Sequence, residues 1–137
     1  MKKNIFLFVI LTSIFSFADT QKAISGKVTL AKGADKDLKP HGALFIFAKK
    51  AGQESANGTP PLAVLRVVDP QFPYDFSLSA ENAMMPGTPF EGPFAVYARY
   101  SPSGDALDKS GPQGVGGNAK DKIKLGQKNL QIELKKK

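Results

Sequence analysis

The stretch Ala43-Leu44-Phe45-Ile46-Phe47-Ala48 is an unbroken apolar run that includes two phenylalanines. A short run of this kind is typical of a strand that is covered on both faces, whereas a half-exposed strand alternates apolar and polar residues. Residues 31–42, which precede it, are charged and contain glycine and proline, so they indicate a loop or a short helical turn. We therefore expect residues 43–48 to form a central strand in the middle of the core.

Shorter segments on both sides of this run alternate apolar and polar residues. Residues 24–30 place Ile24, Val28 and Leu30 on one side and polar residues on the other. Such alternation is typical of a strand with one buried and one wet face. Further strands are expected at residues 62–68, 74–79, 94–99 and 130–135, with a weaker candidate at residues 123–125.

Six or seven short strands separated by turn residues, with no sustained helical period, predict an all-β protein. The expected fold is a single antiparallel β-sandwich of the Greek-key kind, like that of cupredoxins or immunoglobulin domains. Residues 49–60 are polar and rich in glycine and proline, so they are expected to form a long hairpin connection. One short helical turn is expected at residues 81–85, before Pro86.

The N-terminal segment has the pattern of a secretory signal peptide. Lys2 and Lys3 precede an apolar stretch over residues 5–17, and Ser16 and Ala18 place small residues at the positions that determine cleavage. The stretch is shorter than the roughly 20 residues that span a bilayer. We expect a signal peptide at residues 1–18, periplasmic localisation, no membrane span in the mature chain, and a single domain over residues 19–137.

The bulk composition excludes several classes of function. The chain has no cysteine, so disulfides, thiol chemistry and lipid attachment through a cysteine are not available to it. The formal net charge is +7, with 19 basic and 12 acidic residues, which favours acidic partners or membrane head groups. Nucleic acid is not an expected partner because export separates the protein from it, and the lysines are scattered instead of interleaved with exposed aromatics.

Residues for metal binding or catalysis are sparse. A blue-copper site requires two histidines and a cysteine, and His41 is the only histidine. A weaker alternative is a copper-handling or small-molecule carrier that uses Met84, Met85 and His41, because thioethers suit Cu(I), although methionine more often fills gaps in a core. His41, beside Pro40 and Gly42, is expected at the surface. We expect no metal and no cofactor.

Enzymatic activity is not expected either. A single histidine would have to serve as the base for a serine, and no Gly-x-Ser-x-Gly turn is present. The glycine-rich residues 111–120 lack the Gly-Lys-Ser/Thr ending of a phosphate loop and are interpreted as a flexible surface loop. Three terminal lysines, residues 135–137, leave open a structural envelope protein whose tail contacts anionic surfaces.

Arg66 and Arg99 are the only arginines in a chain whose other basic residues are lysines. Arginine offers a planar fork for bidentate pairing, so its use indicates a geometric requirement. One interpretation is internal: pairing with Asp69, Asp75 or Glu91, or packing on Tyr97 or Tyr100. The other is that both arginines project from one face and receive the carboxylates of a partner.

Four blocks of sequence resemble one family. They are residues 44–49, residues 61–66, the run Phe76-Ser77-Leu78-Ser79-Ala80-Glu81-Asn82-Ala83-Met84-Met85-Pro86-Gly87, and residues 96–106 with their Ser-x-Ser-Gly-Asp-Ala turn. By order and spacing the chain resembles the C-terminal periplasmic domain of the cytochrome c maturation subunit CcmI, here as a free-standing exported copy. Arg66 and Arg99 both lie within these blocks.

The resemblance implies a non-catalytic binding or assembly module in cytochrome c maturation. Its implied partners are apocytochrome c or components of haem ligation. The transmembrane segments and helical repeats that accompany this domain in the family are missing from the sequence. A free-standing copy would therefore act in trans or would have been recruited to another task.

Overall fold

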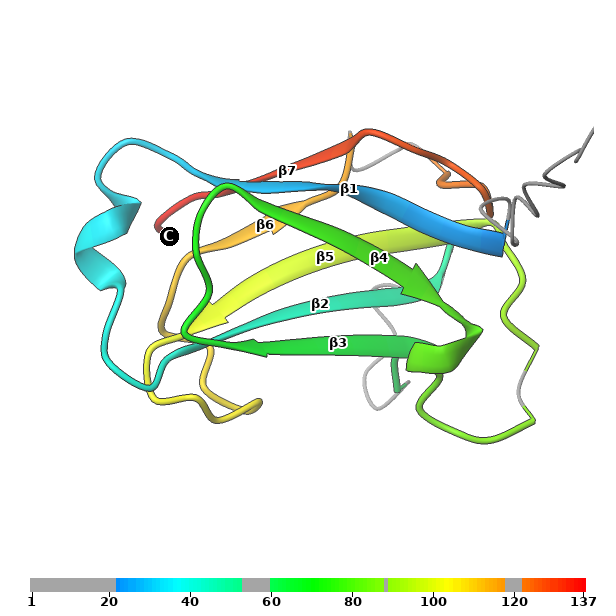
Figure 1. Cartoon of the computed structure of the whole chain (residues 1–137), viewed down its shortest axis with the longest axis horizontal. Helices are drawn as coiled ribbons and strands as arrows, with labels where there is room; N and C mark the ends of the chain where they lie inside the picture. The colour runs from blue at the N-terminus through cyan, green and yellow to red at the C-terminus, as the bar shows by residue number, and fades with distance from the viewer. Residues whose placement is uncertain (1–21, 53–59, 88, 118–121) are drawn as a thin grey trace, which may run out of the picture.

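The computed structural model describes residues 22–52, 60–87, 89–117 and 122–137, and these form a two-layer β-sandwich (Figure 1). The first sheet has the strand order β4-β1-β7, and the second has the order β3-β2-β5-β6. The described residues form seven strands: β1 (Ala23–Leu30), β2 (Ala43–Lys50), β3 (Ala63–Val68), β4 (Tyr74–Ser79), β5 (Phe94–Ser101), β6 (Gln113–Val115) and β7 (Leu130–Leu134). The all-β sandwich predicted from the sequence is confirmed.

The core lies between the two sheets and is built from alternate residues of their strands. Side chains that are essentially inaccessible to solvent come from both layers, because successive residues of a strand point to opposite faces. The largest of them are Tyr100, Phe94, Ile24, Leu44, Ile46, Leu78, Ile123, Ile132 and Leu134. The alternation read from residues 24–30, 74–79, 94–99 and 130–134 therefore identified the inward faces correctly.

Strand β2 is the centre of the four-stranded sheet, as the sequence predicts. It pairs antiparallel with β3 on one side and with β5 on the other. Leu44, Ile46 and Ala48 face the other sheet and are fully buried, and Phe45 on the opposite face is only 6% exposed. The apolar run is thus covered on both faces, and on the outer face the Arg66 side chain lies over the Phe45 ring.

One strand pairing departs from the expected antiparallel sandwich. Strands β1 and β7 run parallel, with Gly26 opposite Leu130 and Leu30 opposite Leu134. The other four pairings are antiparallel. Gly26 is needed in this pairing because a Cβ there would lie 2.0 Å from the carbonyl oxygen of Leu130. Local alternation does not encode strand direction, so the sequence could not reveal this pairing.

The two sheets are linked along one side of the sandwich by β6 and β7. Gln113 pairs with Arg99 of β5 and also forms an isolated bridge with Lys135, just after β7. Gly114 allows this close approach, since a Cβ there would lie 2.2 Å from the carbonyl oxygen of Glu133. On the other side, a bridge between Ala63 and Ala83 joins the start of β3 to the segment after β4.

Two sequence interpretations need correction here. The glycine-rich residues 111–120 were expected to be a flexible surface loop, but Gln113–Val115 form strand β6; residues 118–121 lie outside the described residues. The weaker strand candidate at residues 123–125 is only an isolated bridge between Ile123 and Phe94. The inward residue of β6 is Gly114, which has no side chain and so gives no apolar alternation to recognise.

The helical turns are short. The connection between β1 and β2 contains the 3-10 turn η2 (Ala34–Asp37), and β4 is followed by η3 (Ala80–Asn82). The turn expected at residues 81–85 is thus shorter and begins earlier, because Ser79 and Asn82 form a capping box that starts it directly after β4.

A buried tyrosine fixes the connection between β1 and β2. The Tyr100 hydroxyl accepts a hydrogen bond from the Lys39 amide at 2.9 Å and donates one to the Lys39 carbonyl at 3.0 Å. Gly42 makes room for this ring, since a Cβ there would lie 1.9 Å from the tyrosine oxygen. The entry into the central strand is therefore held by a side chain from β5.

The predicted signal peptide at residues 1–18 lies outside the described residues, as do residues 53–59 of the predicted hairpin connection. The antiparallel pairing of β2 with β3 agrees with a hairpin between them. Within the described residues, no helix is both long and apolar enough to cross a membrane.

Candidate functional site

The outer face of the four-stranded sheet, which points away from the other sheet, carries an unusual set of side chains. Pairing places Arg66 of β3 opposite Phe45 of β2, and Phe45 opposite Arg99 of β5. Gln113 of β6 continues this row. One row of the face is therefore two cations with an aromatic ring between them.

The neighbouring row of the same face is apolar. It consists of Val64, Phe47, Tyr97 and Val115, which are cross-strand neighbours in that order. The rings of Phe47 and Tyr97 stack with their centres 5.4 Å apart. The outer face thus sets a cationic row beside an aromatic one, a combination that suits an amphipathic partner more than bulk water.

Both arginines lie against this aromatic surface. The Cζ atom of Arg66 is 5.8 Å from the ring centre of Phe45, and that of Arg99 is 5.8 Å from the ring centre of Phe47. A guanidinium at this distance from a ring face is attracted by its quadrupole. The rings restrict how far the two guanidinium groups can move.

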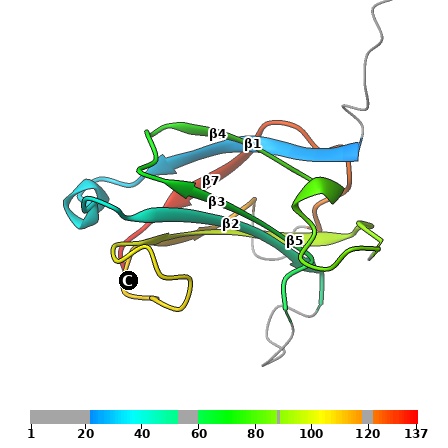
Figure 2. The ribbon, with the colours of Figure 1, turned by 60° about the horizontal axis from the view of Figure 1, so that its bottom comes forward.

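Each arginine also donates a hydrogen bond to the loop between β5 and β6, residues 102–112. Arg66 donates to the Gly104 carbonyl at 3.3 Å, and Arg99 donates to the Ala106 carbonyl. The loop therefore stands on the outer face, where Figure 2 shows it in yellow on the side of the sheet away from the other layer. Two long side chains from β3 and β5, the strands on either side of β2, thus fix the position of this loop.

The expected internal ion pairs do not form. Asp69 accepts a hydrogen bond from the His41 amide, and Asp75 lies 3.9 Å from the Lys27 ammonium. Within the described residues, no carboxylate lies within ion-pair distance of either guanidinium, and the buried Nε of Arg99 has no hydrogen-bond partner. Both guanidinium groups pack on phenylalanine rings, Arg66 on Phe45 and Arg99 on Phe47.

The loop itself is held by Asp108. Its carboxylate accepts hydrogen bonds from the Ser110 hydroxyl at 2.6 Å, the Ser110 amide at 2.9 Å and the Ser103 hydroxyl at 2.7 Å. These bonds, those from Ser110 above all, hold the pKa of Asp108 well below its ordinary value. At the tip of the loop, the Leu107 side chain is 82% exposed.

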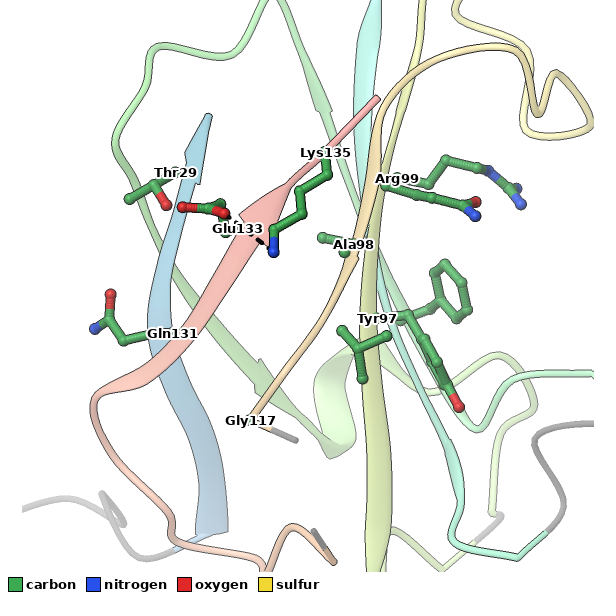
Figure 3. A pocket seen from close by; sticks show the side chains of 12 residues that line it. Thr29, Tyr97, Ala98, Arg99, Gly117, Gln131, Glu133 and Lys135 are labelled. Atoms are coloured by element: carbon green, nitrogen blue, oxygen red, sulfur yellow. Dashed lines mark ion pairs between the residues drawn. The ribbon is translucent and has the colours of Figure 1, made fainter. Parts of the chain in front are cut away.

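An open groove of about 720 Å³ runs over β6, between the outer face and β7. Figure 3 shows Tyr97 and Arg99 on one side of β6 and Gln131, Glu133 and Lys135 on the other. We call this the β6 groove; its lining also includes Phe47, Ala98, Gln113, Gly114, Val115 and Gly117. Arg99 lines the groove, whereas Arg66 does not.

The residues suggested for copper do not come together. The His41 amide is bonded to Asp69, beyond the end of β2 at which Ala43 pairs with Val68. The Met84 amide donates to the Leu62 carbonyl, at the other end, where Ala48 pairs with Ala63. Ala43 and Ala48 are separated by about 16 Å at the rise of a β-strand. One ion cannot be bound by both His41 and Met84 in this arrangement.

The exposure of these residues corrects one interpretation and confirms another. Met84 and Met85 are 53% and 63% exposed, so they do not fill a gap in the core. His41 is at the surface as expected, in a left-handed conformation with φ of 66°. Among the described residues there is no group of three or more His, Cys, Asp or Glu that could hold a metal ion.

Within the described part of the chain, two of the three lysines at the end of the sequence form ion pairs. The Lys135 ammonium lies 3.5 Å from Glu133, and the Lys136 ammonium lies 3.5 Å from Asp37. These pairs are largely exposed, so each contributes little to stability. The tail is thus not a uniform cationic surface.

Residues 24–134 match the family described as the Ig-like domain of cytochrome c-type biogenesis protein H. The chain belongs to this family. No curated protein sequence matches it. Among solved structures, this Ig-like domain is similar to an alternative pilotin from the type II secretion system of Vibrio cholerae, with 12% identity, a TM-score of 0.46, and coverage of 84% of this chain and 97% of that one.

Sequence reasoning selected Arg66 and Arg99 in this Ig-like domain but missed the residues around them. Phe45 and Phe47 were assigned to the core because they belong to an unbroken apolar run, yet both lie on the outer face, Phe45 between the arginines and Phe47 in the neighbouring row. Val115 was assigned to a loop and instead lines the groove, 38% exposed. The alternation of aromatic and aliphatic residues within residues 43–48 was the available signal.

Proposed function

We propose that this Ig-like domain is a non-catalytic protein-binding module that acts in cytochrome c maturation in the periplasm. The family match over residues 24–134 supports the biological setting. The observation that carries the proposal is the outer face, where Arg66 and Arg99 flank Phe45 and have no carboxylate partner within the described residues. The proposed partner is apocytochrome c or a component of haem ligation.

The physical basis is the number of guanidinium donors to which the described residues offer no protein acceptor. Arginine has five donors in a rigid fork that matches a carboxylate, and among the described residues each of these arginines makes one hydrogen bond, to a loop carbonyl. The aromatic rings beneath them restrict their motion, which lowers the entropy lost when a partner binds. An acidic segment of a partner would therefore gain paired hydrogen bonds on a preformed surface.

The remaining parts of the proposal concern export of the protein to the periplasm. The protein is exported through a signal peptide at residues 1–18, which is cleaved after Ala18, and acts as a free-standing domain in trans. The N-terminal sequence of the chain supports this assignment. Mass spectrometry of the protein from a periplasmic fraction should then give a mature N-terminus at Asp19; a chain that begins at Met1 would contradict it.

Fluorescence anisotropy tests the binding function. Labelled peptides from the haem-attachment region and the C-terminal part of apocytochrome c are titrated with the domain at low and moderate salt. Saturable binding that a scrambled peptide does not reproduce is expected. If neither peptide binds better than its scrambled version, apocytochrome c is not the partner.

Charge reversal locates the surface. The pair Arg66→Glu and Arg99→Glu should weaken binding by about tenfold or more, because opposed charges are replaced by like charges. The matched control is Lys32→Glu with Lys36→Glu, which changes the net charge equally at exposed positions between β1 and β2. An equal loss in both double variants would show that net charge, and not this face, determines binding. Circular dichroism establishes that both variants are folded.

A further inference from the structure

We propose that the β6 groove binds a short acidic peptide segment of a protein partner, with one large apolar side chain of that segment against Phe47, Tyr97 and Val115. This inference rests on the proposed protein-binding function and makes it more specific. It assigns the contact to one half of the outer face, the half that contains Arg99 and not Arg66.

Strand β6 lies close to β7 because its middle residue, Gly114, has no side chain. Gly114 pairs with Ala98, and both residues line the groove together with Gly117. The close approach of Gly114 to the backbone of Glu133 keeps β6 pressed between β5 and β7. A partner chain that lies along β6 would therefore meet Gln113 and Val115, which flank Gly114 and share the outer face with Arg99 and Tyr97.

One wall of the groove is apolar and preformed. The stacked rings of Phe47 and Tyr97 stand beside Val115, which is the cross-strand neighbour of Tyr97. Val115 is 38% exposed although it belongs to the sheet. A large apolar side chain that covers these three residues would remove their exposed surface from water, which contributes roughly 25 cal/mol for each Å² buried.

Arg99 provides the charge recognition. Its Nε is buried without a hydrogen-bond partner, its Nη2 is bonded to the Ala106 carbonyl, and its Cζ lies over the ring of Phe47. A carboxylate placed at the guanidinium would supply acceptors that the described residues do not provide. The preference for an acidic group therefore follows from the other guanidinium donors, for which the described residues provide one acceptor, the Ala106 carbonyl.

The opposite wall of the groove has polar side chains that can exchange their present partners for groups of a peptide. Lys135 and Glu133 form a pair at 3.5 Å, with side chains that are 70% and 53% exposed. A pair this exposed is worth little, so Lys135 can turn to a second carboxylate of the peptide at small cost. The amides of Gln113 and Gln131, which also line this groove, can hydrogen-bond to a peptide backbone.

An open groove favours a segment of a protein over a free small molecule. Small-molecule sites enclose most of the ligand surface, about 70–90% of it. The β6 groove is open to solvent, with lining side chains on both sides of β6. A peptide compensates for this partial enclosure because contacts outside the groove add to its affinity.

Selection from a random peptide library tests the inference directly. Phage-displayed peptides are selected on the immobilised domain, and the enriched sequences are expected to place Asp or Glu next to Phe, Tyr, Trp or Leu. The critical variant is Val115→Trp, which fills the groove, and its matched control is Val68→Trp. Val68 is 48% exposed on the same face of the sheet but does not line the groove.

We expect the selected peptides to bind Val115→Trp at least tenfold more weakly than the wild type and to bind Val68→Trp unchanged. Arg99→Gln should weaken binding more than Arg66→Gln. Equal binding to Val115→Trp and the wild type, enriched sequences without acidic residues, or no enrichment above the bare support would each overturn the inference.

A second measurement keeps the test valid if Val115→Trp does not fold. Amide chemical shifts of the isotope-labelled wild-type domain are recorded while a selected peptide is added. Shifts are expected at Gln113–Val115 and around Arg99 and Lys135; shifts confined to β3 would overturn the inference. Library peptides that bind the groove while the apocytochrome peptides fail would reject the proposed cytochrome partner and leave the groove intact.

Discussion

The two faces of the four-stranded sheet come from alternate residues of the same strands, yet they have opposite properties. On the inner face, Leu44, Ile46 and Ala98 pack against the other sheet and are at most 1% exposed. On the outer face, Phe45 and Phe47 pack against arginine side chains, and these arginines hold the loop of residues 102–112 on this face in place of a second sheet. The side chains of the inner face are buried within the domain, whereas the outer face is buried only in part.

This difference shows how a small domain separates stability from recognition. Apolar side chains of the inner face bury their whole surface, so they contribute most of the favourable free energy of folding. The outer face uses the same backbone to hold aromatic rings and guanidinium groups, which are the groups that the proposed binding function requires. Substitutions on the inner face should therefore act on folding, and substitutions on the outer face should act on binding.

The largest expected effect is that of Ile46→Ala on the inner face. The change removes a fully buried side chain at the centre of β2, so the free energy of unfolding should fall by about 2–5 kcal/mol. Urea denaturation followed by circular dichroism measures it. A loss below about 1 kcal/mol would mean that the inner face is not the principal source of stability.

Tyr100→Phe should have a smaller effect on the same inner face. The change keeps the ring and removes both hydrogen bonds to Lys39, which should cost about 1–2 kcal/mol. The same denaturation experiment measures the loss. Hydrogen exchange at the Lys39 and Gly42 amides should accelerate relative to the wild type, and unchanged exchange there would show that the hydroxyl does not fix the entry to β2.

Phe47→Ala tests the outer face at the position next to Ile46. The lost ring stack with Tyr97 should cost about 1 kcal/mol, less than the change at Ile46. Binding of peptides selected on the wild type should nevertheless fall by at least tenfold, because the apolar wall and the support beneath Arg99 are lost. If Phe47→Ala destabilises as much as Ile46→Ala and leaves binding intact, the contrast between the faces is wrong.

The smallest effect concerns Asp108 in the loop on the outer face. Because the folded state lowers the pKa of Asp108, its hydrogen bonds contribute stability above the ordinary aspartate pKa of about 4, and the contribution is lost as pH falls below that value. Asp108→Asn should therefore be slightly less stable than the wild type near neutral pH. Urea midpoints of the two proteins, measured over a pH series, should converge in acid; a constant difference would contradict the assignment.

Much of the fold was predictable because most of its strands keep a period of two. Residues 74–79 and 130–134 show the inward face directly, with Phe76, Leu78, Ile132 and Leu134 all buried. The central position of β2 followed from its unbroken apolar run. These predictions depend on side chains that differ between the two faces, which is the information a single sequence contains.

The parts that were missed depend on contacts between distant segments. Strand β6 is defined by its pairing with Tyr97, Ala98 and Arg99, and its glycine has no side chain to signal burial. The parallel pairing of β1 with β7 joins segments about a hundred positions apart in the sequence. The arginines were identified by their rarity, but their bonds to the loop carbonyls required the folded structure.

The parallel pairing of β1 and β7 also determines how the domain responds to force. If tension is applied through the residues that precede β1 and those that follow β7, the two strands are pulled in opposite directions along their length. The hydrogen bonds between them are then loaded in shear and share the load, instead of opening one after another as in a peeled hairpin. The β1–β7 pair would therefore resist unfolding when the domain is pulled in this direction.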